Sequence, residues 1–294
     1  AALKRYLSEE RFRIQLHDLL ADEALAASAT LEVTFAEYKN VAPAKESAGD
    51  LLKHLEAKSE KLVHLFAHGA YFSTAQNTKP FADAFAILAG KAVHVDGYTV
   101  WANLRRYPCL LLIYAVGISA LASGNCQVLK ELASAQIYVR HDDHKSAPAP
   151  VRFNNHKVLD YENGRSLLIG KERRHTAFSD YLFDIIRPPL EKLAPDPSRY
   201  ERLFDDFEYL WALLVVDAEL QQGKTNPWPP YGAFAWRRRR DGDWLRTQLN
   251  AALQKKNSDL ALLKCGLFGG EFERLRAAIA AADPILDRIS MELH

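Results

Sequence analysis

CLLLIYAVGISALA, residues Cys109–Ala122, is the most apolar stretch of the 294-residue chain. It is shorter than the roughly 20 residues that a membrane-spanning helix needs. Pro108 stands at the position of a first helical turn, and Gly124-Asn125 follows as a stop signal. A helix that is apolar on all its faces is a central core helix when it belongs to a soluble protein. The stretch therefore predicts a buried core helix with other helices packed around it, and no membrane span.

Apolar residues at helical spacing predict further helices on both sides of this core helix. The first is expected over Ser8–Tyr38, with Ser8 as its N-cap and two acids in its first turn. Farther along, a helix over Phe178–Leu193 is expected to break at Pro188-Pro189. Asp196-Pro197 predicts the start of the next helix, whose wide apolar stripe over Leu203–Val216 marks a second buried element.

The character of the chain changes at Val139. The stretch VRHDDHKSAPAPVRFNNHK that begins there is polar and contains prolines, which predicts a long loop. Two short apolar runs, VLDY and SLLIG, then flank ENGR, whose Asn-Gly pair predicts a small β-hairpin near 156–170. The sequence thus predicts a mainly α fold, a multi-helix bundle of two helical subdomains. They are an N-terminal subdomain over 1–138 and a C-terminal subdomain over 176–294, joined by the polar loop and hairpin over 139–175.

Composition limits the classes of partner and compartment. Hydrophobic residues make up 48% of the chain, which is ordinary for a folded globular protein. Because 38 Lys and Arg balance 37 Asp and Glu, bulk attraction to nucleic acid or an anionic membrane is not expected, although a local patch can still bind. The few cysteines, Cys109, Cys126 and Cys265, favour a reducing, cytoplasmic location, and the N-terminus shows no targeting signal. Since the chain opens at Ala1, already in helical register, we expect a fragment of a longer polypeptide.

A run of four arginines, Arg237–Arg240, is the sharpest local signal. It directly follows TNPWPPYGAFAW, a segment rich in proline and aromatic residues. Guanidinium groups bind phosphates and aromatic rings stack on bases, so the segment predicts a site for single-stranded nucleic acid or for a partner protein. The alternative is a solvated loop end, with one arginine pairing with acids such as Asp241 or Asp243. The candidate binding residues are Arg237, Arg238, Arg239, Arg240, Trp228, Tyr231 and Trp236.

Other polar clusters favour plainer interpretations. The segment Arg140–His144 contains metal-ligand residue types, but neighbours in a loop point apart, so no metal site is expected. The basic cluster Lys171–His175 is expected to be a solvated helix start, although it could join the arginine run in one patch. Asp205, Asp206 and Glu208 do not share one helix face, which favours a solvated surface over an acid-base or metal site. Walker, dinucleotide-binding, HExxH, CxxC and GxSxG motifs are missing, so neither an enzyme nor a bound cofactor is expected.

The segment RFRIQLH, with Arg11 and His17 expected in one helix, loosely resembles the arginine-to-histidine spacing of HEPN-type ribonucleases. Those helical enzymes use such a pair at a dimer interface. In this chain Phe12 stands where that pattern has a polar residue. The resemblance implies, as a third hypothesis, a ribonuclease in which His17 acts as general base.

Three longer blocks carry a broader resemblance. They are similar to the helical C-terminal regions of large, poorly characterised bacterial proteins, whose N-terminal parts look like effector or ATPase domains of anti-phage defence systems. The blocks are packing motifs, so the resemblance implies a helical fold and carries over no active-site residue. They are LRRYPCLLLIYAVGISALASGN (104–125), RLFDDFEYLWALLVVDAEL with YGAFAWR (202–220 and 231–237), and LLKCGLFGGEFERL (262–275).

The function expected from these observations is that of a non-enzymatic helical sensor or interaction domain of a larger bacterial protein. Its partner would be another protein or a covalently linked effector domain. Such a domain could also form oligomers. The main alternative is a nucleic-acid-binding module that uses Arg237–Arg240 as its phosphate contacts.

Overall fold

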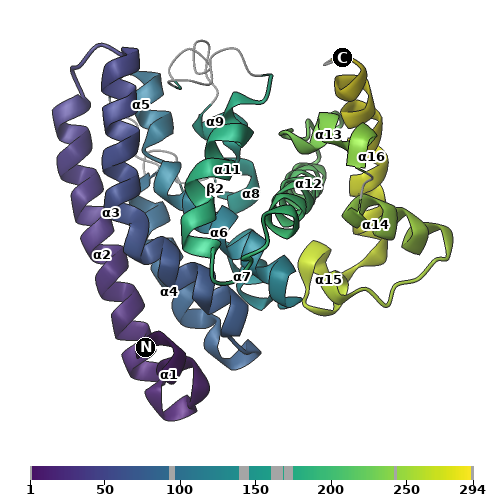
Figure 1. Cartoon of the computed structure of the whole chain (residues 1–294), viewed down its shortest axis with the longest axis horizontal. Helices are drawn as coiled ribbons and strands as arrows, with labels where there is room; N and C mark the ends of the chain where they lie inside the picture. The colour runs from purple at the N-terminus through teal and green to yellow at the C-terminus, as the bar shows by residue number, and fades with distance from the viewer. Residues whose placement is uncertain are drawn as a thin grey trace.

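Helices make up most of the computed structural model, which describes residues 2–92, 97–138, 146–159, 168, 175–241 and 244–292 (Figure 1). Within these residues the only sheet is one small antiparallel hairpin. The mainly α fold expected from the sequence is therefore confirmed. Figure 1 shows the N-terminal helices on one side of the molecule and the last helices on the opposite side, with the middle of the chain between them.

The N-terminal helices stack in pairs, with α4 on α2 and α6 on α3. The helix expected to begin at Ser8 starts later. Ser8 ends α1, where its hydroxyl donates to the carbonyl of Arg5 (2.9 Å), and a short 3-10 turn separates it from α2. The elements are α1 (Ala2–Ser8), η1 (Glu10–Phe12), α2 (Arg13–Tyr38), α3 (Lys45–Phe72), η2 (Ala75–Asn77), α4 (Lys79–Ala92), α5 (Thr99–Leu104), α6 (Tyr107–Ser123) and α7 (Gln127–Ser134).

The expected core helix is α6. Every residue from Tyr107 to Ala120 is buried, Pro108 stands in the first turn, and Gly124 ends the helix in the left-handed conformation at φ 71°. By length and composition Thr99–Ser123 could cross a membrane, but 83% of its apolar window is buried inside the protein, which is typical of a core helix. Gly117 lets α12 (Pro197–Gln221) approach closely, because a Cβ there would lie 1.9 Å from the ring of Phe207.

The described hairpin is a different one from the hairpin expected near 156–170 and lies earlier in the chain. Strand β1 (Gln136–Tyr138) pairs with β2 (Ser146–Pro148), and Gln136 faces Pro148. Part of the expected long loop is therefore ordered as β2 and two short helices, α8 (Ala149–Arg152) and α9 (Asn155–Val158). Val158, expected in a strand, ends α9, because Asn154 caps that helix by accepting the N–H of Lys157 (3.0 Å). Most of the hairpin expected near 156–170 lies outside the described residues, as does the cluster at 140–144.

The C-terminal half surrounds one long helix, α12, which begins as expected with Asp196 accepting the N–H of Arg199 (2.9 Å). The break expected at Pro188-Pro189 does not occur, because both prolines stand in the last turn of α11 and the helix ends at Leu190. The elements are α11 (Ala177–Leu190), α12 (Pro197–Gln221), α13 (Phe234–Asp241), α14 (Trp244–Gln254), α15 (Ala261–Lys264), η3 (Leu267–Gly270) and α16 (Phe272–Glu292).

One apolar cluster runs through the described residues of both halves, from Leu3 in α1 to Leu286 in α16. Helix α6 lies at its centre and contacts α3, α7, α11 and α12. The stripe expected over Leu203–Val216 is almost entirely buried, as predicted. The division into two subdomains stays a prediction, and the two halves share this continuous core.

Candidate functional site

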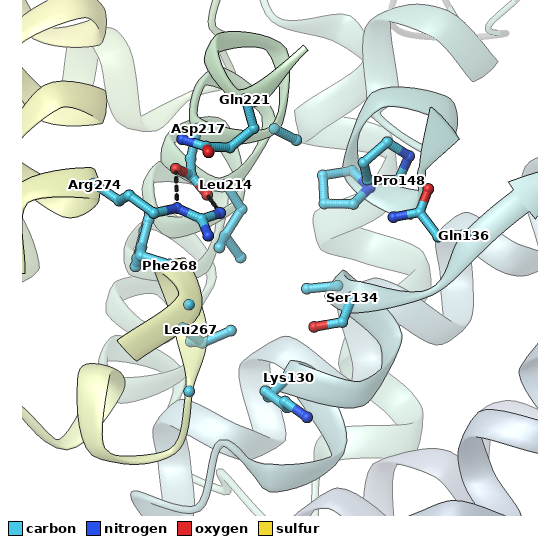
Figure 2. Close-up of a pocket in the computed structure, with 15 residues that line it drawn as sticks. Lys130, Ser134, Gln136, Pro148, Leu214, Asp217, Gln221, Leu267, Phe268 and Arg274 are labelled. Atoms are coloured by element: carbon cyan, nitrogen blue, oxygen red, sulfur yellow. Dashed lines mark hydrogen bonds and ion pairs between the residues drawn. The ribbon is translucent and has the colours of Figure 1, made fainter. Parts of the chain in front are cut away.

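A cleft of about 530 Å³ opens between elements from the two halves of the chain (Figure 2). One wall comes from α7 and the β-hairpin, and the opposite wall from the end of α12, η3 and the start of α16. Figure 2 shows Pro148 and Gln136 facing Asp217 and Arg274 across the opening. The volume falls within the range of about 300–1,000 Å³ that is usual for ligand sites. The lining combines polar groups of Lys130, Ser134, Gln136, Gln221 and Arg274 with apolar groups of Pro148, Pro150, Leu214, Leu267 and Phe268.

An ion pair holds the α12–α16 wall of this cleft. The guanidinium of Arg274 donates from Nε to Oδ1 of Asp217 (3.0 Å) and from Nη2 to Oδ2 (2.7 Å). Asp217 is only 4% exposed, so its buried charge depends on this bidentate contact. Gly269, at φ 67°, lets the guanidinium lie close to the chain, since a Cβ there would be 2.5 Å from Nη1 of Arg274. The pair therefore fixes the shape of the wall.

The polar groups of the cleft carry no large excess of charge. Lys130 lies 2.9 Å from Glu131, and Arg274 is neutralised by Asp217. The side chains of Ser134 and Gln136 are exposed, and their hydroxyl and amide groups can both donate and accept hydrogen bonds. This combination suits a ligand with alternating donors and acceptors and an apolar part.

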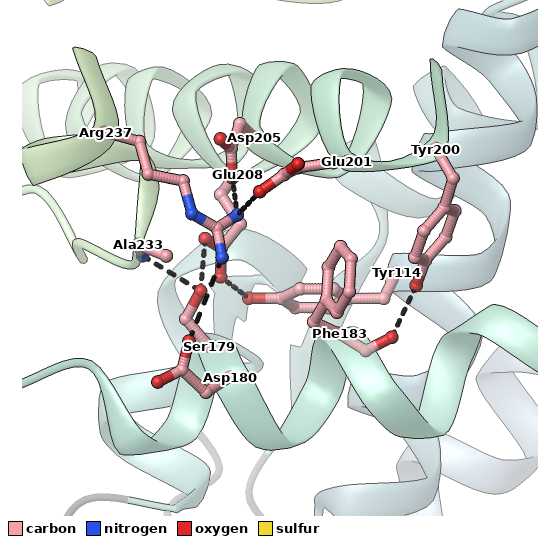
Figure 3. A network of polar contacts seen from close by, with 10 residues as sticks. All are labelled: Tyr114, Ser179, Asp180, Phe183, Tyr200, Glu201, Asp205, Glu208, Ala233 and Arg237. Carbon is pink, nitrogen blue, oxygen red and sulfur yellow. Dashed lines mark hydrogen bonds and ion pairs between the residues drawn. The ribbon is translucent and has the colours of Figure 1, made fainter. Parts of the chain in front are cut away.

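A buried carboxyl group forms a second polar centre (Figure 3). Glu208 on α12 is 4% exposed and accepts hydrogen bonds from the hydroxyls of Tyr114 on α6 (2.9 Å) and Ser179 on α11 (2.7 Å). Ser179 in turn accepts the N–H of Ala233 (2.9 Å). Burial raises the pKa of Glu208 to about 8, although the two hydroxyls oppose the shift. At neutral pH the group is therefore mostly protonated, which suits a linker between helices better than an ionic site.

Arg237 lies beside this network and faces inward. Its Nη1 lies 3.1 Å from Oδ1 of Asp205 and 3.2 Å from Oε1 of Glu201, and Nη2 is 4.0 Å from Asp180 (Figure 3). Burial raises the pKa of Asp205 to about 7, and the charge of Arg237 opposes that rise. The first arginine of the run is therefore engaged by acids of α11 and α12.

A second carboxyl group, that of Glu56, makes similar contacts two turns of α6 away from Tyr114. Glu56 on α3 accepts hydrogen bonds from the hydroxyls of Tyr107 (2.8 Å) and Tyr181 (2.5 Å). Tyr107 and Tyr114 are seven residues apart on α6, so they lie on the same side of that helix. Helix α11 contributes a hydroxyl to each carboxyl group, Tyr181 to one and Ser179 to the other. The two contacts therefore connect α11 to α3 in the N-terminal half and to α12 in the C-terminal half.

The structure distributes the predicted binding residues over different surroundings. Arg237 belongs to helix α13, not to a loop end, and the side chains of Arg238, Arg239 and Arg240 lie outside the described residues. Trp228 is 47% exposed, with the guanidinium of Arg288 5.9 Å from the centre of its ring.

The rest of the aromatic segment packs against the protein. The backbone carbonyl of Tyr231 accepts the side-chain amide of Asn155 (3.3 Å), and its ring lies 4.6 Å from that of His156. Trp236 is partly buried beside Arg237, whose guanidinium lies 5.8 Å from its ring. Of the three predicted aromatic binding residues, Trp228 is thus the one whose ring is exposed to solvent.

The expectation of a solvated face for Asp205, Asp206 and Glu208 is wrong. Neighbouring elements surround this part of α12, so each carboxylate meets a partner from another element, and Asp206 accepts the N–H of Leu245 (3.0 Å). The sequence contains one hint of this burial: Glu208 is flanked by Phe207, Tyr209 and, one turn on, Ala212. Ser179 and Tyr114 were not expected in a site, because nothing in their local sequence marks them.

The pair suggested by the HEPN-like spacing does not occupy one helix. Arg11 lies in η1 and pairs with Glu9 (2.7 Å), and His17 lies in α2 beside Asp18 (3.2 Å). Over the described part of the chain, no group of three or more His, Cys, Asp or Glu side chains is arranged to hold a metal ion.

Comparisons with known proteins identify no relative of this chain. No protein-family model matches the sequence, and neither curated proteins nor solved structures give a significant match.

Proposed function

We propose that the chain is a non-enzymatic helical sensor and interaction module of a larger cytoplasmic bacterial protein of the anti-phage defence type, working beside an effector domain. In this proposal the cleft between α7 and α12 binds a peptide segment of a protein partner. The observation that carries it is the cleft itself, whose lining has a mixed polar and apolar character.

The lining matches the chemistry of a peptide. An extended backbone needs donors and acceptors along its length, and the side chains of Ser134, Gln136 and Gln221 supply both. Leu214 and Leu267 offer apolar surface to a side chain. Because Glu131 and Asp217 neutralise the nearby cations, the cleft favours an uncharged backbone over a polyanion.

The two walls give such binding a route to the rest of the protein. A peptide in the cleft would touch α7 and the hairpin on one side and α12 and α16 on the other. Its binding energy would therefore favour one spacing of the two walls, which is how a sensor converts recognition into a change of shape.

The test uses a peptide selected from a random display library on the wild-type chain and titrated by fluorescence anisotropy. Ser134→Trp places an indole in the cleft and should weaken binding at least tenfold. Ser198→Trp is the matched control: it is exposed on the first turn of α12, roughly 24 Å along the helix from Leu214. Equal binding by both variants would show that the peptide sits elsewhere and would remove the cleft from the proposal.

The exposed ring of Trp228, with Arg288 beside it, favours nucleic-acid binding as the second candidate. Fluorescent single-stranded RNA and DNA should then bind with an affinity that falls steeply with salt. The double substitution Arg238→Ala and Arg239→Ala should weaken that binding, whereas a peptide-binding module should show neither effect.

A further inference from the structure

Two cysteines that are far apart in sequence meet beside the cleft. Cys126 precedes the first turn of α7 and is 4% exposed, and Cys265 follows α15 and is partly exposed. The two side chains lie close enough for their thiols to interact. The thiol of Cys265 also lies 3.1 Å from the carbonyl oxygen of Leu262. One thiol is therefore accessible, and its neighbour is sheltered.

Local packing holds the two segments together. Gly266, directly after Cys265, has φ 95°, so the chain turns sharply there. Cε of Lys130 lies 3.4 Å from the position a Cβ on Gly266 would take, and the N–H of Lys130 donates to the carbonyl of Cys126 (2.8 Å). Lys130 and Gly266 both line the cleft. The cysteine pair therefore lies at its rim.

We propose that Cys126 and Cys265 are a redox-active dithiol that closes reversibly to a disulfide, with Cys265 as the attacking thiol and Cys126 as the resolving one. The proposal rests on the contact between the two thiols and on their unequal exposure, and it does not depend on what the cleft binds.

The surroundings of Cys265 together favour its thiolate, although the hydrogen bond that its thiol donates to the carbonyl of Leu262 favours the protonated form. The hydrogen bond from the Cys126 thiol lowers the pKa of Cys265 to about 7, and burial opposes that shift. The backbone N–H of Leu267 and the charge of Lys130 act in the same direction as the thiol. The thiolate is the reactive form of cysteine, so Cys265 should react near neutral pH.

With hydrogen peroxide as oxidant, the thiolate of Cys265 attacks one peroxide oxygen and the O–O bond breaks. Cys265 becomes a sulfenic acid, and the departing hydroxide takes a proton to form water. The sulfur of Cys126 then attacks the sulfur of Cys265, the S–O bond breaks, and the Cys126 proton leaves with the hydroxyl as a second water. Two electrons pass from the two thiols to the peroxide. A small dithiol reductant restores both thiols by exchange.

The first test oxidises the full chain with graded hydrogen peroxide and maps the products by mass spectrometry. Wild type and Cys109→Ala should both lose two hydrogens and yield a peptide linked through Cys126 and Cys265. Cys109 is the matched control because it is fully buried in α6. Oxidation without that linked peptide, or with Cys265 only as sulfinic or sulfonic acid, would overturn the proposal.

The second test follows alkylation of Cys265 by iodoacetamide against pH. The rate in wild type should have its midpoint near pH 7, and in Cys126→Ala the midpoint should move toward the ordinary cysteine value of about 8.5. At neutral pH the variant should react roughly threefold more slowly, because a larger loss of thiolate is partly offset by higher nucleophilicity. An unchanged midpoint would contradict the role of Cys126.

Discussion

The buried carboxyl group of Glu208 should make the stability of this protein depend on pH in a way that one isosteric substitution removes. Its pKa is about 8 in the folded protein, against an ordinary value of 4.5. Between these values the folded state holds a proton that the unfolded state releases. The free energy of unfolding therefore falls as pH rises through this window, and the stabilisation is fully present only below it.

The size of the effect follows from the width of the window. Each pH unit inside it changes the free energy of unfolding by about 1.4 kcal/mol, so the contribution of Glu208 falls by about 2.5 kcal/mol between about pH 5.5 and about pH 7.5. Glu208→Gln keeps the shape of the neutral acid and cannot ionise. A protonated carboxyl group donates from one oxygen and accepts at the other, and the glutamine amide can do the same toward Tyr114 and Ser179, so the contacts of the neutral form are retained.

The assay is urea unfolding followed by tryptophan fluorescence and circular dichroism over this pH range. Glu208→Gln should gain about 2.5 kcal/mol relative to wild type from the low end of the range to the high end, with unchanged m-values. Asp205, whose pKa is raised in the same direction, contributes to the slope of both proteins. The control Glu60→Gln changes an exposed glutamate on α3 and should run parallel to wild type. Parallel curves for Glu208→Gln would refute a neutral Glu208.

Four further substitutions, three that change packing and one that removes a buried ion pair, are measured by the same unfolding assay. Gly232→Ala should destabilise by about 1–3 kcal/mol because its Cβ would lie 2.0 Å from the buried carboxyl group of α12, whereas Gly90→Ala, with open space in α4, should stabilise by about 0.5–1 kcal/mol. Arg274→Ala should cost about 3–5 kcal/mol by leaving Asp217 buried without its partner, and a smaller loss would show that water replaces the guanidinium. Leu112→Asp should prevent folding, and a soluble, helical variant would contradict the assignment of α6 as the core.

The candidate sites were less predictable than the helices. Four adjacent arginines suggested a phosphate site, yet the first of them, Arg237, is held by Asp205 and Glu201 from another helix. Nothing near Cys126 in the sequence points to Cys265, because a turn after α15 brings them together. The cleft likewise joins residues of α7 and the hairpin to residues of α12, η3 and α16. Such contacts depend on how helices cross, which local spacing does not encode.

The sequence by itself determined the helices and the centre of the core. The apolar run of α6, its proline at the start and Gly124 at its end act over a few residues, and so does the cap of α12 at Asp196. Only the tertiary structure decided which polar groups are inside. Glu208 is neutral because the surrounding helices bury it and exclude water, while Tyr114 and Ser179, from two other helices, are its hydrogen-bond partners. Burial depends on which elements folding brings next to a residue. For that reason the sequence predicted a solvated carboxyl group at Glu208, whereas the folded protein encloses it.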